Sequence, residues 1–358
     1  IMGFEGFPLI VGWELTLACN LRCRHCGSSA ALPRRDELNV EECLAICEQL
    51  PALLVQEVDF TGGEPLLRPD WSRIATHLGE LGIRTKLLTN GLTLGPDTVA
   101  QLKDACIAGV GVSIDGLEAT HDHIRDRTGL FQHALAGIER VSNAGLPVTV
   151  ITTVNGLNID ELPALFVLLR SLGVDAWQVQ PIFPLGRGKA ASGLRLSEQA
   201  YMQLGAFVGE WGPLSAETGT ELMPGDSFGY FTELDMREPP WGGCSAGLTA
   251  CGITSDGKVK GCLALPDELV EGDLRHKDLW DIWFREDAFP YTRQFSIDRL
   301  GPACQTCDMA EQCKGGCSAM SYACSQAFHN DPYCFYGMRR RDAQGLQRAW
   351  SAGTRPRE

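Results

Sequence analysis

The sequence predicts an α/β fold in which a partial (β/α)6, TIM-like barrel precedes a small cysteine-rich C-terminal domain. Two observations carry this prediction. Six β-rich runs alternate with amphipathic stretches over residues 8–212, a pattern typical of a parallel sheet covered by helices. Nine of the fifteen cysteines then fall after residue 243. The chain has 358 residues, 44% of them hydrophobic, and can therefore bury one full core and a smaller one.

The predicted strands are rich in β-branched and aromatic residues, and Gly, Pro or polar residues bound them. They cover residues 8–17, 54–60, 84–89, 109–114, 147–154 and 175–181. The predicted helices carry apolar residues every three or four positions, and several end at a Gly. They cover residues 40–50, 70–82, 96–106, 130–145, 158–173 and 197–211. Six such units do not close an eightfold barrel, so we expect an open side and functional groups at the carboxyl ends of the strands.

The regular pattern ends near Gly212. Residues 213–240 show no sustained periodicity and predict a connection or lid. We therefore expect the barrel over residues 1–212, this connection over 213–240, the cysteine-rich domain over 241–338, and a C-terminal helix or tail over 339–358.

The charge and the start of the chain exclude several functions. A formal net charge of -14 disfavours a broad phosphate-binding surface, so nucleic acid is not an expected partner. No apolar run approaches the ~18 residues of a membrane helix, and the first residues lack the features of an export signal. We therefore expect a cytoplasmic protein with no membrane partner. In such a compartment, fifteen cysteines favour metal binding over disulfides.

Three cysteines directly follow the first predicted strand, at positions Cys19, Cys23 and Cys26. Thiolates at such short spacing allow one loop to hold an iron–sulfur cluster, and three ligands on four irons leave one iron open. On these residues alone, a zinc site with His25 as the fourth ligand, or buried cysteines without a metal, are equally open alternatives.

This CxxxCxxC motif, together with Gly62-Gly63-Glu64-Pro65 after the second strand, resembles the radical S-adenosylmethionine superfamily. The resemblance implies that the three cysteines hold a [4Fe–4S] cluster whose open iron binds S-adenosylmethionine. One electron then cleaves this cofactor, and the resulting 5′-deoxyadenosyl radical abstracts a substrate hydrogen. The resemblance also implies that Gly62, Gly63 and Glu64 form a segment that contacts the methionine amino group. His25 departs from the aromatic residue often found before the last cysteine.

Short polar side chains follow the third and fourth predicted strands, namely Asn90, Ser113 and Asp115. Asn-Gly and Asp-Gly pairs also suit ordinary turns, because both tolerate positive φ. The resemblance implies that Ser113 and Asp115 contact the cofactor ribose and that Asn90 lies at the same mouth. Residues 121–125 resemble an HDxxR element, which implies that Arg125 reaches the cofactor carboxylate through its guanidinium fork. A solvated arginine on a helix surface is the ordinary alternative.

The C-terminal cysteines, with Gly257 between the first two of the series, resemble the seven-cysteine pattern of the SPASM domain. The resemblance implies two auxiliary [4Fe–4S] clusters, and three clusters in all. It assigns Cys244, Cys251, Cys262 and Cys317 to the first, and Cys304, Cys307, Cys313 and Cys334 to the second. Cys251 lies outside the seven-cysteine signature, and without it the first auxiliary cluster would have an open iron. On spacing alone, a pair of zinc ribbons fits as well.

SPASM enzymes mostly modify peptides made on ribosomes, so the resemblance implies a peptide maturase that makes an oxidative modification such as a cross-link. Because the chain begins almost at the first strand, we expect a separate leader-peptide-binding protein, together with a flavodoxin- or ferredoxin-type reductant. Gln178, Gln180, Arg187, Tyr230 and Trp241 are candidates for a peptide channel, although ordinary strand-end and core roles fit each. The alternatives are dehydrogenation of a small alcohol or sugar, sulfatase maturation, and a non-catalytic zinc or electron-carrier protein.

Overall fold

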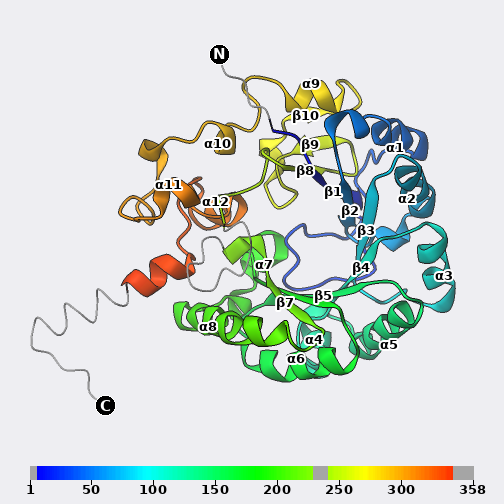
Figure 1. The fold of residues 1–358 in the computed structure, drawn as a ribbon, viewed down its shortest axis with the longest axis horizontal. Coiled ribbons are helices and arrows are strands. Elements are labelled where there is room, and N and C mark those ends of the chain that lie inside the picture. The colour runs from blue at the N-terminus through cyan, green and yellow to red at the C-terminus, as the bar shows by residue number, and fades with distance from the viewer. Residues whose placement is uncertain (1–5, 229–240, 342–358) are drawn as a thin grey trace, which may run out of the picture.

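The computed structural model describes residues 6–228 and 241–341, and its framework is one ten-stranded sheet in the order β10-β9-β8-β1-β2-β3-β4-β5-β6-β7 (Figure 1). Strands β1 to β7 run parallel to one another. The first six are β1 (Ile10–Thr16), β2 (Glu57–Gly62), β3 (Arg84–Thr89), β4 (Gly109–Ser113), β5 (Val148–Val154) and β6 (Ala176–Pro181). All six predicted strands are therefore confirmed, with ends within three residues of the predicted ones.

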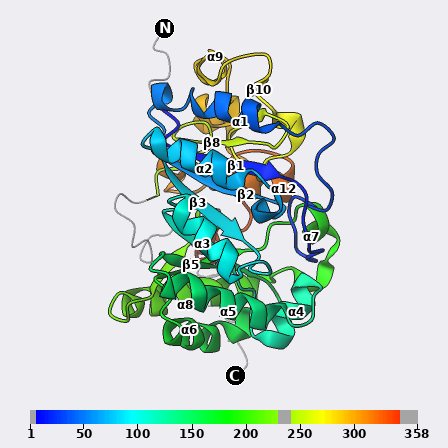
Figure 2. The same cartoon turned by 90° about the vertical axis from the view of Figure 1, so that its right-hand side faces the viewer.

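Helices cover the outer face of this curved sheet (Figures 1 and 2). They are α1 (Val40–Cys47), α2 (Trp71–Glu80), α3 (Pro96–Asp104), α4 (Glu118–Arg125), α5 (Leu130–Asn143), α6 (Leu162–Ser171) and α8 (Glu198–Ser215). The short helix α7 (Gly186–Ala190) follows β6 and lies instead toward the middle of the molecule in Figure 1. In β5, alternate residues are fully buried and the intervening ones are partly exposed. One face of the strand therefore packs on helices, and the other faces the barrel interior. Helices α4 and α7 were not predicted.

A seventh parallel strand, β7 (Glu221–Pro224), pairs with β6 inside the range predicted to be a connection. Ser215 at the end of α8 accounts for this placement, because its hydroxyl accepts a hydrogen bond from the Leu222 backbone N–H at 2.9 Å. Four residues are too few to show a strand periodicity, so the prediction of an irregular connection is wrong at this point. Residues 229–240, which include Tyr230, lie outside the described chain.

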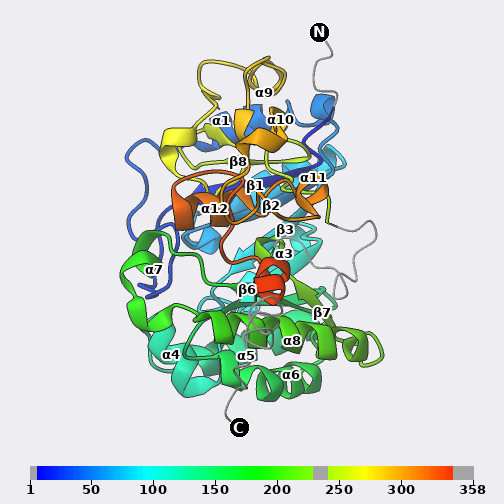
Figure 3. The same ribbon diagram turned by 90° about the vertical axis from the view of Figure 1, so that its left-hand side faces the viewer.

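The cysteine-rich region continues the same sheet at the β1 edge. Strand β8 (Ala250–Ile253) pairs parallel with β1, and β9 (Lys258–Lys260) and β10 (Gly272–Asp273) follow antiparallel. Helices α9 (Leu279–Trp283), α10 (Pro290–Arg293), α11 (Ala310–Cys313) and α12 (Ser318–Ser325) complete the region, with a further helix over residues 335–341. In both Figure 1 and Figure 3, α12 lies next to α7. Over the described ranges, no helix is long and apolar enough to span a bilayer.

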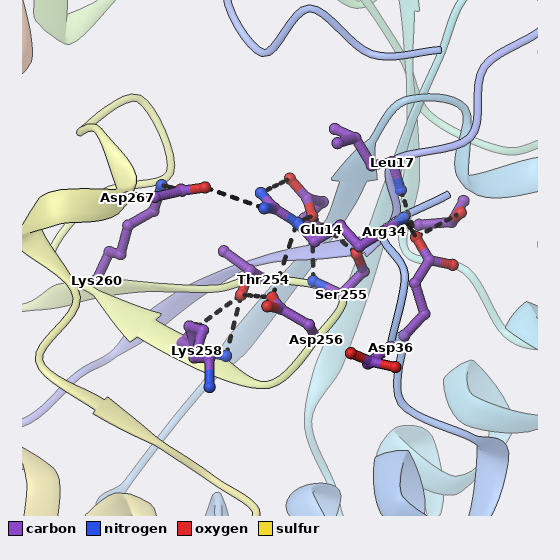
Figure 4. Close-up of polar contacts among 12 residues, drawn as sticks. Glu14, Leu17, Arg34, Asp36, Thr254, Ser255, Asp256, Lys258, Lys260 and Asp267 are labelled. Carbon is purple, nitrogen blue, oxygen red and sulfur yellow. Dashed lines mark hydrogen bonds and ion pairs between the residues drawn. The ribbon is translucent and has the colours of Figure 1, made fainter. Parts of the chain in front are cut away.

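A buried polar cluster fastens this extension to the barrel (Figure 4). Glu14 of β1 is 5% exposed and accepts hydrogen bonds from Arg34 Nε at 2.6 Å and Nη2 at 3.1 Å. The backbone N–H and hydroxyl of Ser255, which follows β8, donate to the same carboxylate at 3.2 and 2.9 Å. Arg34 Nη1 also reaches Asp267 at 3.1 Å, and Lys260 Nζ reaches that carboxylate at 3.0 Å. Charges on both sides of the β1–β8 seam are therefore paired.

Candidate active site

The loop that carries Cys19, Cys23 and Cys26 leaves the carboxyl end of β1 and is held from the opposite side of the barrel. Arg187 in α7 donates from Nε to the Cys23 carbonyl at 2.8 Å and from Nη1 to the Ala30 carbonyl at 3.0 Å. Its backbone N–H also donates to the Cys26 carbonyl at 3.0 Å. Arg187 was a candidate for a peptide channel, and the structure instead shows it supporting the cysteine loop.

The three thiols share an apolar pocket formed by Leu21 and Leu130, with Leu92 packed against it. Burial raises the pKa of Cys19, and raises that of Cys23 to about 11. All fifteen cysteines are free thiols. Within the described ranges, no three Cys, His, Asp or Glu side chains converge as they would on a single metal ion. Three thiols in one loop are a donor set that fits an iron–sulfur cluster.

Gly62 and Gly63 hold the cysteine loop against β2. A Cβ on Gly62, whose φ is +134°, would lie 2.2 Å from the Thr16 carbonyl oxygen, and a Cβ on Gly63 would lie 2.1 Å from that of Ala18. Both contacts are with the chain that leads into the cysteine motif, so any larger residue would displace it. The absence of a Cβ at both positions is therefore required for the chain between β1 and the cysteine motif to pack against the end of β2.

Glu64 ties the ends of β2 and β3 together. Its carboxylate is fully buried and accepts hydrogen bonds from Thr89 Oγ1 and the Asn90 backbone N–H, both at 2.8 Å. Burial raises the pKa of Glu64 to about 7. The Asn90 side chain in turn donates from Nδ2 to Asn20 Oδ1 at 2.7 Å, which reaches the cysteine loop. The structure thus brings Glu64 and Asn90 beside the cysteine loop. It also places Asn20 at this site, a residue that no sequence pattern singles out.

Asp115 forms the centre of a buried ionic group. Its Oδ2 lies 2.8 Å from Arg125 Nη2 and 3.1 Å from His25 Nε2, while Oδ1 accepts the Thr153 backbone N–H at 2.8 Å. Asp115 is fully buried, and the guanidinium of Arg125 holds its pKa well below the usual range. Arg125 extends from there to the cysteines, with Nη1 4.0 Å from Cys23 Sγ. This geometry suits Asp115 to positioning Arg125 and His25.

The remaining predicted contact, Ser113, ends β4 with its side chain partly exposed. Its hydroxyl makes no hydrogen bond to any residue that the structure describes, which leaves it available to a ligand. His25 is the functional residue that the sequence prediction undervalued. It lies 90 positions from Asp115, and no spacing in the sequence signals that the two pair.

The C-terminal cysteines gather into two neighbourhoods. The thiols of Cys244 and Cys262 both lie close enough to Cys317 to raise the pKa of its thiol. A second set consists of Cys304, Cys307, Cys313 and Cys334, in which Cys304 is near Cys307 and Cys313, and Cys334 is near Cys304 and Cys313. The second neighbourhood contains the four cysteines of one group that the SPASM resemblance implies, and the first contains three of the four cysteines of the other.

Cys251 stands apart from both neighbourhoods. It lies in β8 at 2% exposure, within the main hydrophobic core, and the Arg293 guanidinium is the charged neighbour that acts on its thiol. The structure therefore gives Cys251 less support as a cluster ligand than the other seven. Among the cysteines outside these groups, Cys43 and Cys47 are buried in α1. Cys106 is exposed beyond the end of α3.

Comparison with known proteins matches both parts of the chain. Residues 13–169 match the radical SAM superfamily, and residues 244–308 match the SPASM iron–sulfur cluster-binding domain. The AdoMet-dependent heme synthase of Methanosarcina barkeri is 31% identical over 347 residues, which cover 92% of this chain and 97% of that protein. The mycofactocin maturase of Mycolicibacterium smegmatis is 30% identical over 338 residues, which cover 92% of this chain and 83% of that protein.

Among solved structures, Streptococcus suis SuiB bound to its precursor peptide SuiA superposes with a TM-score of 0.73 at 18% identity. The match covers 92% of this chain and 76% of that one, and it shows the shared fold. The α/β partial barrel with a cysteine-rich C-terminal domain is thus found in a known structure.

Proposed function

This chain belongs to the radical S-adenosylmethionine superfamily and carries a SPASM domain, and from that premise we propose that it oxidises a ribosomally made peptide. The observation that carries the choice of substrate is the similarity to a maturase along 92% of the chain. The expected product is an oxidised peptide, for example one with a cross-link.

The proposed roles at the barrel follow from the contacts of the cysteine loop. Cys19, Cys23 and Cys26 would hold the catalytic cluster, and Ser113 would meet the cofactor. When bound, the cluster and S-adenosylmethionine supply an electron and then the hydrogen-abstracting radical. Arg125 places a buried positive charge 4.0 Å from Cys23 Sγ, which favours the thiolate that metal binding requires.

Residues around this loop keep its geometry fixed. Asp115 and His25 orient the Arg125 guanidinium, and Asp115 is already saturated with donors, so it acts as a positioning residue. Arg187 and the glycine pair fix the loop backbone from two sides. Such bracing matters because cofactor cleavage depends on accurate placement of the reacting groups.

The two C-terminal cysteine groups would hold the auxiliary clusters, giving three [4Fe–4S] clusters in all. Such clusters would supply one-electron redox chemistry, which suits an overall reaction that oxidises the substrate. A flavodoxin- or ferredoxin-type protein would supply the first electron, and a separate leader-peptide-binding protein would deliver the peptide. Since Cys251 lies in the core beside Arg293, seven thiols have stronger support than eight.

A haem precursor is the second candidate substrate. It is favoured by the similarity to a heme synthase, which extends over 97% of that protein at 31% identity. Both candidates share the same cofactor cleavage and differ only in the molecule that loses hydrogen.

Anaerobic turnover tests the proposal. The reconstituted protein is given reductant, S-adenosylmethionine and either a precursor peptide with its binding protein or an iron porphyrin that bears propionate groups. We expect 5′-deoxyadenosine and a change in the mass of the peptide. Consumption of the porphyrin alone would establish the second candidate, and a protein that never cleaves S-adenosylmethionine would refute both. The variant in which Cys19, Cys23 and Cys26 are all alanine is the control for background cleavage.

A further inference from the structure

A cavity of about 370 Å³ lies where the barrel meets the cysteine-rich region. Its barrel wall comes from the end of β6, from α7 and from the start of α8, and includes Ile182, Gly188 and Tyr201. Its other wall comes from α12 and the segment before Cys334, and includes Met320 and Tyr333. Figures 1 and 3 both show α7 and α12 side by side at this place.

The segments that line the cavity either contact or continue into the segments that carry the three cysteine groups. Gly188 lines the cavity, and a Cβ on it would lie 3.1 Å from the His25 carbonyl oxygen in the N-terminal cysteine loop. Helix α12 has Cys317 as its N-cap, and Tyr333 directly precedes Cys334. A molecule in the cavity would therefore touch segments that lead to the catalytic site and to both auxiliary sites.

The chemistry of the lining is divided between an apolar floor and a cationic rim. Ile182, Leu196 and Met320 are each at most 8% exposed and supply the floor. Lys189 and Arg195 lie at the exposed rim, and neither forms an ion pair with any carboxylate in the described part of the chain. Arg195 Nη2 donates a hydrogen bond to the Lys189 carbonyl at 3.1 Å, which keeps the two cationic residues next to each other.

A buried polar group also lies in the wall. Tyr201 is 0% exposed, and its hydroxyl has no hydrogen-bond partner among the described residues. A buried hydroxyl without a hydrogen bond is unfavourable, and a ligand that bonds to it removes that cost. Cys324 and the exposed Arg195 both line the same cavity as Tyr201.

We propose that this cavity is the substrate-binding site, and that it takes an apolar group bearing a carboxylate. The carboxylate lies against Arg195 and Lys189, the apolar part packs on Ile182, Leu196 and Met320, and the Tyr201 hydroxyl bonds to a polar atom of the substrate. This inference rests on the proposed function and narrows its substrate. A peptide with a free C-terminal carboxylate and a porphyrin with propionate groups both present this chemistry.

Binding measurements on the reconstituted full chain with S-adenosylmethionine separate these sources. One pair of probes is a glycine–serine hexapeptide ending in phenylalanine, with a free carboxylate or a C-terminal amide. The other pair is an iron porphyrin with free propionates or with methyl esters. We expect the acid to bind more tightly than its neutral partner in at least one pair, and the pair that shows this identifies the source. No preference in either pair overturns the proposal.

Variants test the residues. Arg195→Gln should weaken binding of the preferred acid by about tenfold or more, because a charge-assisted hydrogen bond is lost. Tyr201→Phe removes only the hydroxyl and should weaken binding severalfold. Lys103→Gln, an exposed cation on α3, is the matched control and should leave the Kd unchanged. An Arg195→Gln variant that binds the acid as tightly as Lys103→Gln does would overturn the proposal.

Cleavage of S-adenosylmethionine, measured without substrate, separates a failure of the cavity proposal from a failure of the proposed function. Lys103→Gln should form 5′-deoxyadenosine at the wild-type rate, because Lys103 lies on α3 and lines neither the cavity nor the N-terminal cysteine loop. Normal cleavage by the wild type, together with an Arg195→Gln variant that binds the acid as tightly as the wild type does, refutes the cavity proposal alone. Failure of the wild type to cleave the cofactor refutes the proposed function itself.

Discussion

Replacing Arg34 with methionine tests how the cysteine-rich region is fastened to the barrel. In the wild type, Glu14 is 5% exposed and accepts four hydrogen bonds, two from Arg34 and two from Ser255. The variant keeps the aliphatic part of the side chain and removes the charge. Glu14 then remains buried as a carboxylate with only the two neutral donors of Ser255.

The magnitude follows from these contacts. Removing one partner of a buried ion pair costs about 3–5 kcal/mol, because the other charge stays buried without compensation. The Arg34 side chain is 20% exposed, and Ser255 still bonds to Glu14, so we expect a smaller loss, about 2–3 kcal/mol of unfolding free energy. Losing the contact with Asp267 adds little, since that carboxylate is 61% exposed.

Urea denaturation of the anaerobically reconstituted protein measures this loss. Arg35→Met is the matched control, because Arg35 is exposed and makes no ion pair or side-chain hydrogen bond within the described residues. The control should change stability by no more than about 0.5 kcal/mol. Adding Glu14→Gln to Arg34→Met should restore part of the loss, since the uncompensated charge is then gone. Equal stability of Arg34→Met and Arg35→Met would refute the reasoning.

Three further predictions concern the cysteines and one buried histidine. Replacing Cys19, Cys23 and Cys26 with alanine should abolish 5′-deoxyadenosine formation and lower the iron content from about twelve to about eight per chain, with both auxiliary clusters kept; undiminished cleavage would contradict the assignment. Cys251→Ala should leave the iron content unchanged if the thiol is a core residue, as its position beside Arg293 indicates; loss of a whole cluster, measured by iron analysis and electron paramagnetic resonance, would restore it as a ligand. His121 is buried, and its Nδ1 accepts a hydrogen bond from the Asp115 backbone N–H at 3.0 Å. Burial lowers the pKa of His121 to about 4. The unfolded chain therefore takes up a proton on His121 near pH 6.5, whereas the folded protein does not. The wild type should therefore lose about 3 kcal/mol of stability relative to His121→Asn as the pH falls from about 6.5 to 4, and parallel stability curves for the two proteins would show that His121 is not held neutral.

The barrel was predictable because each of its strand–helix units carries its own local signal. Long helices such as α5 and α8 show an apolar face, and β-branched runs such as β5 alternate. Helix α4 was missed because two of its three buried residues, His121 and Arg125, are polar and hide the apolar periodicity. Strands β7, β9 and β10 have four residues or fewer, too short for any periodicity to appear.

The cysteine positions of the candidate site were also predictable, whereas its supports were not. Spacing alone selects Cys19, Cys23 and Cys26, but nothing local indicates that Arg187 reaches back to their loop across more than 150 positions. The resemblance selects Gly62 and Gly63 as part of a segment that contacts the cofactor. Their packing against carbonyl groups of the chain that leads out of β1 is a contact that only the folded sheet reveals.

The pairing of β8 with β1 fixes how far apart the redox groups of this enzyme can lie. Because backbone hydrogen bonds join the two regions in a single sheet, no hinge separates the start of the N-terminal loop from the strand that leads to Cys262. The rate of electron tunnelling falls off steeply with distance, so a continuous sheet that holds this distance constant also holds the tunnelling rate constant. Lengthening the segment between β7 and β8 should leave that spacing, and hence the tunnelling rate, unaltered.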